Sequence, residues 1–375
     1  MSGAAMWTIT IGSVVVTPSR QVPLGGFVAR VGNSTGILDD LEANLIVLTG
    51  ADAHTIAWVA IDALAVMPEL RTVVVDAVVA LTNCTADQVV VTASHTHSAP
   101  SGWVGQILPA LPAPVDDELL ADLGAAIAGM PLRSTTVRLE TFSAAIDGVG
   151  SNRARPDGPF DPTSVAVMAR DDTGVPVALL YDFACHPTVL GPDSRVISAD
   201  WVGAARRALR RGLGADDLPV VFAQGCAGDV STRFYRQGRL PPEVDRLGSR
   251  VAEWLLAAAG RAEPLAGNGI RLRHDVIELP SRWAPDSTVT VPISSVDIGV
   301  RRWLTVPGEV VASFGIDITA ALPRTRLVSC TDGYIGYLAD ANCHADGSYE
   351  ASASPLTLSD TLEVFRRVEK LGRDQ

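Results

Sequence analysis

Apolar runs of strand length alternate with segments of helical period along the whole chain, and this alternation restricts the fold more than any other feature. The expected strands are 7–16, 44–49, 55–62, 88–93, one or two within 135–149, a hairpin of 165–169 and 177–183, then 218–223, 270–279, 297–306 and 326–330. The expected helices are 67–83, 116–129, 200–213, 242–259, 309–322 and 359–371. Interleaved strands and helices predict an α/β fold, with mixed β-sheets flanked by helices.

Two element boundaries follow from individual residues. Pro176 has no N–H to give to a β-ladder, so it is expected where the second strand of the hairpin begins. Ser359 is expected to cap the last helix, because a serine oxygen can accept from the free N–H groups of the first turn.

The composition favours a folded protein with a sizeable core. Of 375 residues, 47% are hydrophobic and 19% are charged, so one domain spanning 1–375 is expected. The net charge of −12 argues against nucleic acid as a partner and against electrostatic docking on anionic membranes. No run of the sequence has the length and apolarity of a membrane span, so no stable membrane anchor is expected.

The cysteines and the N-terminus together predict a cytoplasmic protein. Residues 1–7 lack the basic and apolar regions of a secretory signal. The cysteines are scattered without zinc-knuckle or C-x-x-C spacing, which favours reduced thiols, although a pairing of Cys330 with Cys343 stays open. They are Cys84, Cys185, Cys226, Cys330 and Cys343.

Two histidines follow the apolar run at 89–91, in the motif Ser94-His95-Thr96-His97-Ser98-Ala99-Pro100. Residues two apart on a strand share a face, and neutral imidazole is a common metal ligand, so His95 and His97 form a candidate metal site. Paired hydrogen-bonding groups are the alternative. The Pro-rich loop 100–115 follows directly and either walls a pocket or is an ordinary surface loop.

Three more motifs stand where an apolar run breaks into a polar turn, and such turns often carry functional residues. His186 lies in Ala-Cys-His-Pro-Thr, Glu309 in Pro-Gly-Glu, and Tyr337 in Tyr-Ile-Gly-Tyr. Taken singly, His186 is also consistent with a packed histidine before a turn proline. Glu309 is consistent with a helix-start carboxylate, and Tyr337 with a half-buried core tyrosine.

Taken together, these motifs resemble the catalytic N-terminal domain of the neutral (alkaline, non-lysosomal) ceramidase family. The resemblance runs in order along nearly the whole chain. It comprises Thr17-Pro18, Gly25-Gly26-Phe27, the motif at 94–100, Asn152-Arg153, His186-Pro187-Thr188, Ser198-Ala199-Asp200, Gly225 to Ser231, Pro307-Gly308-Glu309, and Tyr337 to Tyr349-Glu350.

The resemblance implies a zinc amidase that splits the N-acyl bond of a ceramide into an amine and a fatty acid. Matching the family's motifs to this chain gives His95, His186, Glu309 and Tyr337 as the Zn²⁺ ligands. Two imidazoles, a carboxylate and a phenol leave the ion Lewis-acidic, and zinc can lower the pKa of bound water to roughly 7. Tyrosine is an unusual ligand, because free phenol titrates near ~10.

The resemblance also assigns residues around the metal. His97 is expected to donate to the oxyanion or to pass a proton to the leaving nitrogen. Arg153 and Tyr349 are expected to bind the substrate's oxygens. Asp200 is expected either to orient a histidine ligand or to cap the helix that follows it. The other three histidines match nothing in the family and are expected to be structural or surface residues: His54, His274 and His344.

The chain departs from the family at three points. The Gly-Asp-Val-Ser-Pro-Asn motif, whose serine has been considered a nucleophile, continues here from Ser231 into Thr232-Arg233. His344 stands where the family usually has tyrosine, and the sequence ends at Gln375 without the family's C-terminal β-sandwich domain.

The expected function is therefore a zinc-dependent hydrolase of linear amides that acts on a small N-acyl compound, ceramide-like or smaller, through activated water. One alternative is acyl transfer or lactam chemistry in a biosynthetic pathway at the same zinc site, with a substrate amine in place of water. The other is a zinc-binding protein without turnover.

Overall fold

The main sheet of the computed structural model, which describes residues 6–107, 114–284 and 286–374, has nine strands. Eight of them run in the order β11-β9-β8-β6-β1-β3-β4-β5, and β13 (Glu263–Pro264) pairs with β6. Their bounds are β1 Trp7–Val15, β3 Glu42–Thr49, β4 Thr55–Ile61, β5 Val89–Ala93, β6 Leu132–Ala145, β8 Thr163–Arg170, β9 Pro176–Phe183 and β11 Val220–Gln224. The sheet is mixed, because β4–β5 and β9–β11 are parallel pairs and the other pairs along this path are antiparallel.

The long strand β6 divides this sheet into two halves that face each other. Residues 132–137 pair with β1, and residues 138–145 pair with β8. Because side chains alternate along a strand, each strand contributes to two hydrophobic cores, one on each face of the sheet. Val89 and Val91 belong to the core beneath α1, whereas Val90 belongs to the core between the two halves, with Trp58 and Val167.

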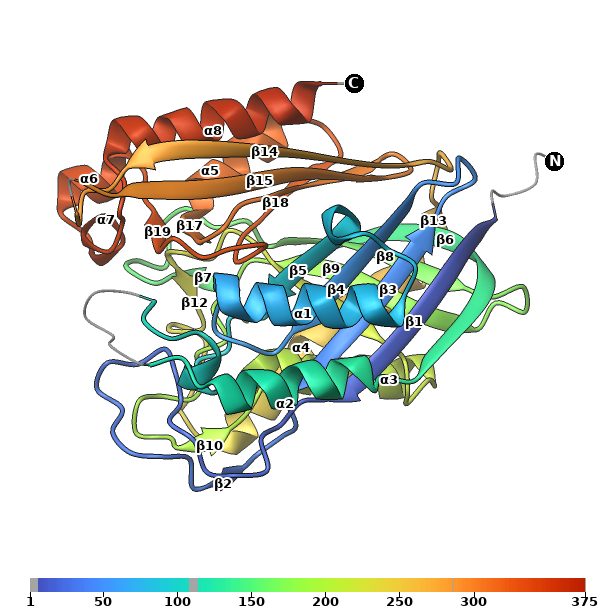
Figure 1. The fold of residues 1–375 in the computed structure, drawn as a ribbon, viewed down its shortest axis with the longest axis horizontal. Helices are drawn as coiled ribbons and strands as arrows, with labels where there is room; N and C mark the ends of the chain where they lie inside the picture. Colours follow the sequence, from blue (N-terminus) through green and yellow to red (C-terminus); the bar gives the residue numbers. More distant parts are fainter. Residues whose placement is uncertain (1–5, 108–113, 285, 375) are drawn as a thin grey trace.

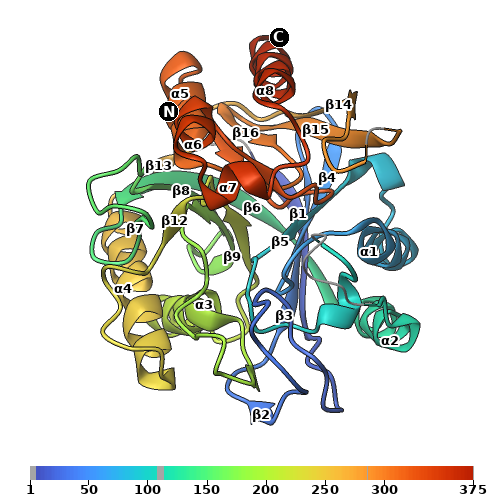
Figure 2. The same ribbon diagram turned by 90° about the vertical axis from the view of Figure 1, so that its left-hand side faces the viewer.

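Helices cover the outer face of each half. α1 (Pro68–Leu81) and α2 (Asp117–Ala128) lie on one side, and α3 (Asp200–Leu213) and α4 (Pro241–Ala259) lie on the other (Figures 1 and 2). The result is a helix–sheet–sheet–helix arrangement, which confirms the predicted fold class.

The last hundred residues form a further layer across the sheet (Figure 1). A four-stranded sheet, β14-β15-β16-β18, packs against α5 and α8. The ring of Trp303 meets that of Trp58 edge-on, with 5.9 Å between their centroids, and so joins this layer to the main sheet. The bounds are β14 Ile270–Pro280, β15 Thr288–Ile298, β16 Arg301–Thr305, α5 Ala312–Ala321, β18 Thr325–Val328 and α8 Leu358–Arg373.

Short elements surround the edges of these layers. β17 and β19 pair in parallel, β12 pairs with β7, and β10 pairs with β2. Their bounds are β2 Gly36–Ile37, β7 Ser151–Asn152, β10 Val196–Ile197, β12 Val230–Ser231, β17 Glu309–Val310, β19 Tyr337–Leu338, α6 Ala341–Asp346 and α7 Tyr349–Ser352, with 3-10 turns at Ala86–Gln88 and Ser101–Trp103.

Two of the expected elements have wrong bounds, and one strand was not predicted. The range 297–306 contains the end of β15, all of β16 and the turn between them, in which Gly299 takes the left-handed φ of +55°. Most of β15 was not predicted, because it contains Pro292 and a proline within an apolar run argues against a strand. The helix expected at 309–322 begins only at Ala312, since Glu309 is held in the β17–β19 ladder.

The cap of the last helix is also different from the prediction. α8 begins at Leu358, and Thr357, not Ser359, is its N-cap, with its side chain accepting from the backbone N–H of Asp360. An N-cap oxygen reaches the third helical residue, and that geometry is met here by Thr357. Pro176 does begin β9, as predicted.

All five cysteines are free thiols, so the bridge left open between Cys330 and Cys343 is not formed. Among the helices of the described residues, none is both long and apolar enough to span a lipid bilayer.

Candidate functional site

His95 lies just beyond the end of β5 and turns sharply out of the strand. Its φ of +67° is in the left-handed region, which is uncommon for any residue with a Cβ. The backbone N–H of His95 donates to the carbonyl oxygen of Ala63, and its Nδ1 lies 2.6 Å from the carbonyl oxygen of Leu64. The ring is therefore fixed and buried, with only Nε2 free to face the site.

His186 follows the end of β9 on the other half of the sheet. Its Nδ1 lies 2.6 Å from the carbonyl oxygen of Ala227 and 2.9 Å from that of Val230. The indole N–H of Trp201 donates to the backbone carbonyl of His186 at 3.2 Å, which fixes the segment. As in His95, the Nε2 atom is left to face the site.

Glu309 stands between these two histidines. Its Oε2 lies 2.8 Å from His186 Nε2 and 3.3 Å from His95 Nε2, and its Oε1 accepts a hydrogen bond from the Tyr334 hydroxyl. Burial alone would raise the pKa of Glu309, but the positive charge of His95 and the hydrogen bond with His186 hold it well below its usual range. Glu309 is thus an anion in the interior of the protein.

The loop before Glu309 has little room. Gly308 has a φ of +141°, and a Cβ there would lie 2.5 Å from the carbonyl oxygen of Gly336. Glycine at this position lets the chain approach the strand that carries Tyr337, so that Glu309 pairs with Tyr337 in the β17–β19 ladder.

His97 is the third histidine of the cluster. Its Nε2 lies 3.4 Å from the Nε2 of His95, and one nitrogen each of His95, His97 and His186 lie within 4.8 Å of one another. Unlike the other two rings, His97 has no partner on its Nδ1 among the described residues. Burial, together with the charges of His95 and His186, holds the pKa of His97 well below its usual value.

Aromatic and glycine neighbours hold the His97 ring. Phe27 meets it edge-on at 4.8 Å between ring centroids, and a Cβ on Gly26 would lie within 2.4 Å of its ring carbon. The guanidinium of Arg30 donates to the backbone carbonyl of His97. The Gly-Gly-Phe motif of the sequence therefore packs against the histidine cluster.

Tyr337 and Arg153 form the opposite side of the site. Arg153 donates through Nη2 to the Tyr337 hydroxyl at 3.4 Å and pairs with Glu350 at 2.7 Å. Its guanidinium lies over the rings of Tyr337 and Tyr349, at 5.5 and 5.6 Å from their centroids. Burial and the charge of Glu309 raise the pKa of Tyr337, and the positive charge of Arg153 opposes that effect.

Ser231 lies beside the cluster but does not join it. The backbone of Ser231 in β12 forms a β-bridge with that of His186, so Ser231 lies close to the site in space. Its Oγ accepts from the backbone N–H of Arg233 at 3.3 Å, and no histidine contact to that oxygen occurs among the described residues. A hydroxyl nucleophile needs a base within reach, and the observed contacts provide none.

Asp200 has neither of its two predicted roles, which were to orient a histidine ligand or to cap α3. Its carboxylate accepts from the backbone N–H groups of Val189, Leu190 and Trp201, so it touches no histidine ring. Ala199 occupies the cap position of α3. Asp200 instead holds the loop that follows His186, because a short acidic side chain can gather several backbone donors at once.

Burial raises the pKa of Asp200 to about 6, although its backbone hydrogen bonds act in the opposite direction. A carboxyl that binds its proton more tightly when folded adds stability below its unfolded pKa, and loses that contribution as pH rises through about 6. Relative to Asp200→Asn, which cannot titrate, wild type should lose about 3 kcal/mol of unfolding free energy between pH 4 and 7. Urea unfolding of both proteins across this range measures the difference, and a constant difference contradicts the assignment.

The other three histidines lie outside the cluster. His54 is exposed and 3.1 Å from Asp52, and His274 bonds the Ser294 hydroxyl and the backbone carbonyl of Asp87. His344 lies on the short helix α6.

A cavity of about 400 Å³ is lined in part by Gly26, Phe27 and Arg30, the three residues that pack against His97. Its apolar walls include Leu24, Phe27, Leu64 and Val104, and the described part of loop 100–115 lines one side, as one of its two interpretations predicted. Residues 108–113 of that loop lie outside the described residues. An apolar cavity next to a polar cluster suits a ligand with one reactive polar group and an apolar chain.

Sequence reasoning did not assign roles to three residues of the site. Tyr334 holds Glu309, Glu350 pairs with Arg153, and Arg30 fixes the backbone of His97. The sequence offered one signal for two of them, which is that each stands next to a predicted site residue. Tyr334 is in the same motif as Tyr337, and Glu350 follows Tyr349.

No protein-family model and no curated protein matches the sequence. Several solved structures match the fold, and two of them are ceramidases. Neutral ceramidase from Pseudomonas aeruginosa aligns with a TM-score of 0.82 at 16% identity, over 99% of this chain and 76% of that one. A ceramidase complexed with C2 aligns with a TM-score of 0.83 at 15% identity, over 97% of this chain and 75% of that one. The chain therefore has the fold of the neutral ceramidases, as the motifs predicted.

Proposed function

We propose that this protein is a zinc-dependent amidase that hydrolyses the N-acyl bond of a small acylated amine, ceramide-like or smaller. The observation that carries the proposal is the meeting of three electron-pair donors: Nε2 of His95, Nε2 of His186 and Oε2 of Glu309. The motif resemblance and the shared fold also support an amidase.

The tautomers explain why these donors indicate a cation. Nδ1 of His95 and Nδ1 of His186 each face a backbone carbonyl, which can only accept, so both carry their proton there. Nε2 of each ring then faces a carboxylate oxygen, either with a second proton, as in a positively charged His95, or with the lone pair that a metal ion would take. Such groups repel each other unless a proton or a metal ion lies between them, and histidines held by carbonyls at the second nitrogen are typical metal ligands.

We assign Tyr337 as the fourth ligand, because its strand pairs with that of Glu309. The guanidinium of Arg153 opposes the rise that burial and Glu309 cause in the pKa of Tyr337, and so acts toward the phenolate form that a metal ligand requires. Two imidazoles with a carboxylate and a phenolate suit zinc. When bound, zinc supplies a Lewis acid that polarises the amide carbonyl and lowers the pKa of water.

The remaining residues handle the substrate. We assign to His97, whose lowered pKa keeps its ring neutral, the transfer of a proton to the leaving nitrogen. Tyr349 and Arg153 present donors for the carbonyl oxygen, and Glu350 holds Arg153 in position. The retention of these groups beside the ligand set supports turnover over simple metal storage.

The cavity lined by Gly26, Phe27 and Arg30 supports an acyl substrate. Its apolar wall suits a hydrocarbon chain, with the amide placed toward the histidines. Two of the solved structures with this fold are ceramidases, and we extend to this chain the N-acyl class of substrate that the motif resemblance implies.

The direct test is a panel of N-acylated amines of different chain length and head group, incubated with purified protein before and after treatment with a chelator. Release of free amine that stops on chelation and returns with Zn²⁺ is the expected result. Absence of release from every member of the panel, with zinc bound at one per chain, favours a zinc protein without turnover.

Ser231→Ala distinguishes hydrolysis by water from the acyl-transfer alternative. Because its Oγ has no base among its observed contacts, the variant should keep most of the wild-type kcat. No acyl-enzyme should accumulate in a pre-steady-state burst. Mass spectrometry that detects an acyl group on Ser231 contradicts this mechanism and favours acyl transfer.

A further inference from the structure

A second cavity lies away from the histidine cluster, between strands β6 and β8 of the main sheet and the segment α5–β18. Its volume is about 530 Å³, within the usual range for small-molecule sites. Phe160, Val165 and Ile316 contribute apolar surface. None of its lining residues belongs to the histidine cluster or to the groups around it.

Three arginines also line this cavity, and one of them is fully neutralised. Arg326 pairs with Asp161 at 2.6 Å and with Asp182 at 2.9 Å, and it donates to the backbone carbonyl of Thr163. The two carboxylates are occupied in turn: Asp161 accepts from the N–H of Thr163, and Asp182 accepts from the indole of Trp303. Arg326 and its partners are therefore structural.

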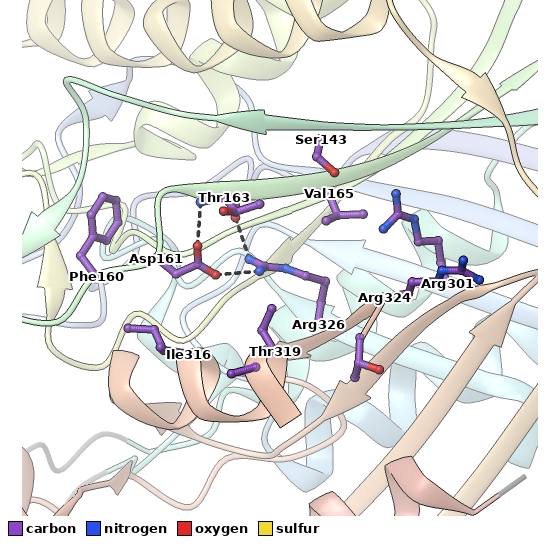
Figure 3. Close-up of a pocket in the computed structure, with 12 residues that line it drawn as sticks. Ser143, Phe160, Asp161, Thr163, Val165, Arg301, Ile316, Thr319, Arg324 and Arg326 are labelled. Atoms are coloured by element: carbon purple, nitrogen blue, oxygen red, sulfur yellow. Dashed lines mark hydrogen bonds and ion pairs between the residues drawn. The ribbon is translucent and has the colours of Figure 1, made fainter. Parts of the chain in front are cut away.

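Arg301 and Arg324 have no such partners. Figure 3 shows them together at one end of the cavity, with Phe160 at the other end. Arg301 donates through Nε to the Thr141 hydroxyl at 3.0 Å, and neither arginine forms an ion pair within the described residues. Burial lowers the pKa of Arg301, and the charges of Arg324 and Arg326 add to that effect while Asp182 opposes it.

Arg324 also occupies an unusual backbone position. Its φ is +65°, in the turn that joins α5 to β18, where glycine or asparagine fits with less strain. A charged side chain at a strained position beside a second unpaired arginine is a feature that packing alone does not explain.

We propose that this cavity binds a small organic monocarboxylate, with its carboxylate between Arg301 and Arg324 and its apolar body along Phe160 and Ile316. The guanidinium fork matches the geometry of a carboxylate. Three arginines against two aspartates leave a single positive charge, which suits a monovalent anion. The apolar end suits a hydrocarbon body rather than inorganic phosphate.

Isothermal titration calorimetry of the full chain with octanoate tests the proposal, with octanol and inorganic phosphate as the comparison ligands. In Glu309→Gln, which disables the histidine site where an acid product would also bind, we expect octanoate to bind at one site and both comparison ligands to bind at least tenfold more weakly. Arg301→Gln and Arg324→Gln should each weaken octanoate about tenfold or more, because each removes charge-assisted hydrogen bonds. Arg211→Gln, which changes an exposed arginine of α3, should bind as wild type does.

Glu309→Gln separates this cavity from the histidine cluster. Octanoate binding that survives in Glu309→Gln but weakens in Arg324→Gln supports the proposal, whether or not the protein proves to be an amidase. Equal binding of octanol and octanoate, unchanged affinity in both arginine variants, or loss of binding in Glu309→Gln overturns it. Thermal unfolding of each variant confirms that the proteins compared are folded.

Discussion

Replacement of His186 by alanine is expected to remove the metal and the activity together. The ring supplies one of the three electron-pair donors that meet at the site, and its Nδ1 is already committed to backbone carbonyls. Loss of an outer-shell partner alone costs about 10–100-fold in metal affinity. Loss of a direct ligand should cost more, so we expect less than stoichiometric zinc by elemental analysis and hydrolysis near background.

His274→Ala is the matched control, because His274 also makes two hydrogen bonds but lies outside the cluster. Glu309→Gln provides a second variant that preserves side-chain volume, and it too should lose metal. Full zinc occupancy in both His186→Ala and Glu309→Gln contradicts the ligand assignment.

His97→Ala and Tyr349→Phe are expected to keep zinc and lower kcat. In the proposed mechanism both residues face charge that develops as the amide breaks, and removal of one such donor typically costs about 10²–10³ in kcat. The Nδ1 of His97 has no carbonyl partner, which separates it from the two fixed ligands. Tyr349 is 54% exposed, so its substitution should leave the core intact.

Steady-state kinetics and metal analysis on the same preparations measure both effects, with the exposed Tyr235→Phe as control. Loss of zinc from His97→Ala identifies His97 as a ligand in a His95–His97–His186 set. Unchanged kcat in Tyr349→Phe removes Tyr349 from the catalytic groups.

The long elements could be predicted from sequence because their apolar period is sustained. The helices α1 to α4 and the strands β1 to β11 of the main sheet follow the expected segments within a few residues. The shorter elements could not, since two residues such as Glu309–Val310 carry no period. Their pairing with Tyr337–Leu338 depends on contacts made only in the folded protein.

His95 and His97 are brought together in a way that differs from the sequence-based prediction. The two histidines were expected on one face of a strand, yet β5 ends at Ala93 and the left-handed turn at His95 brings the rings together. Motif order, not periodicity, identified His186, Glu309 and Tyr337. The partners of these residues, such as Glu350 for Arg153, lie too far along the chain for local patterns to reveal.

The distribution of the site over the chain has a consequence for protein synthesis. His95 and His186 lie on opposite halves of the main sheet, and Glu309 reaches His186 across 123 positions of sequence. Loop closure over such distances is slow, because chain entropy is lost before the contact forms. If the proposed ligand set is right, a nascent chain cannot complete it until Tyr337 has left the ribosome. Metal loading should then be a late, post-translational event that reports completed assembly.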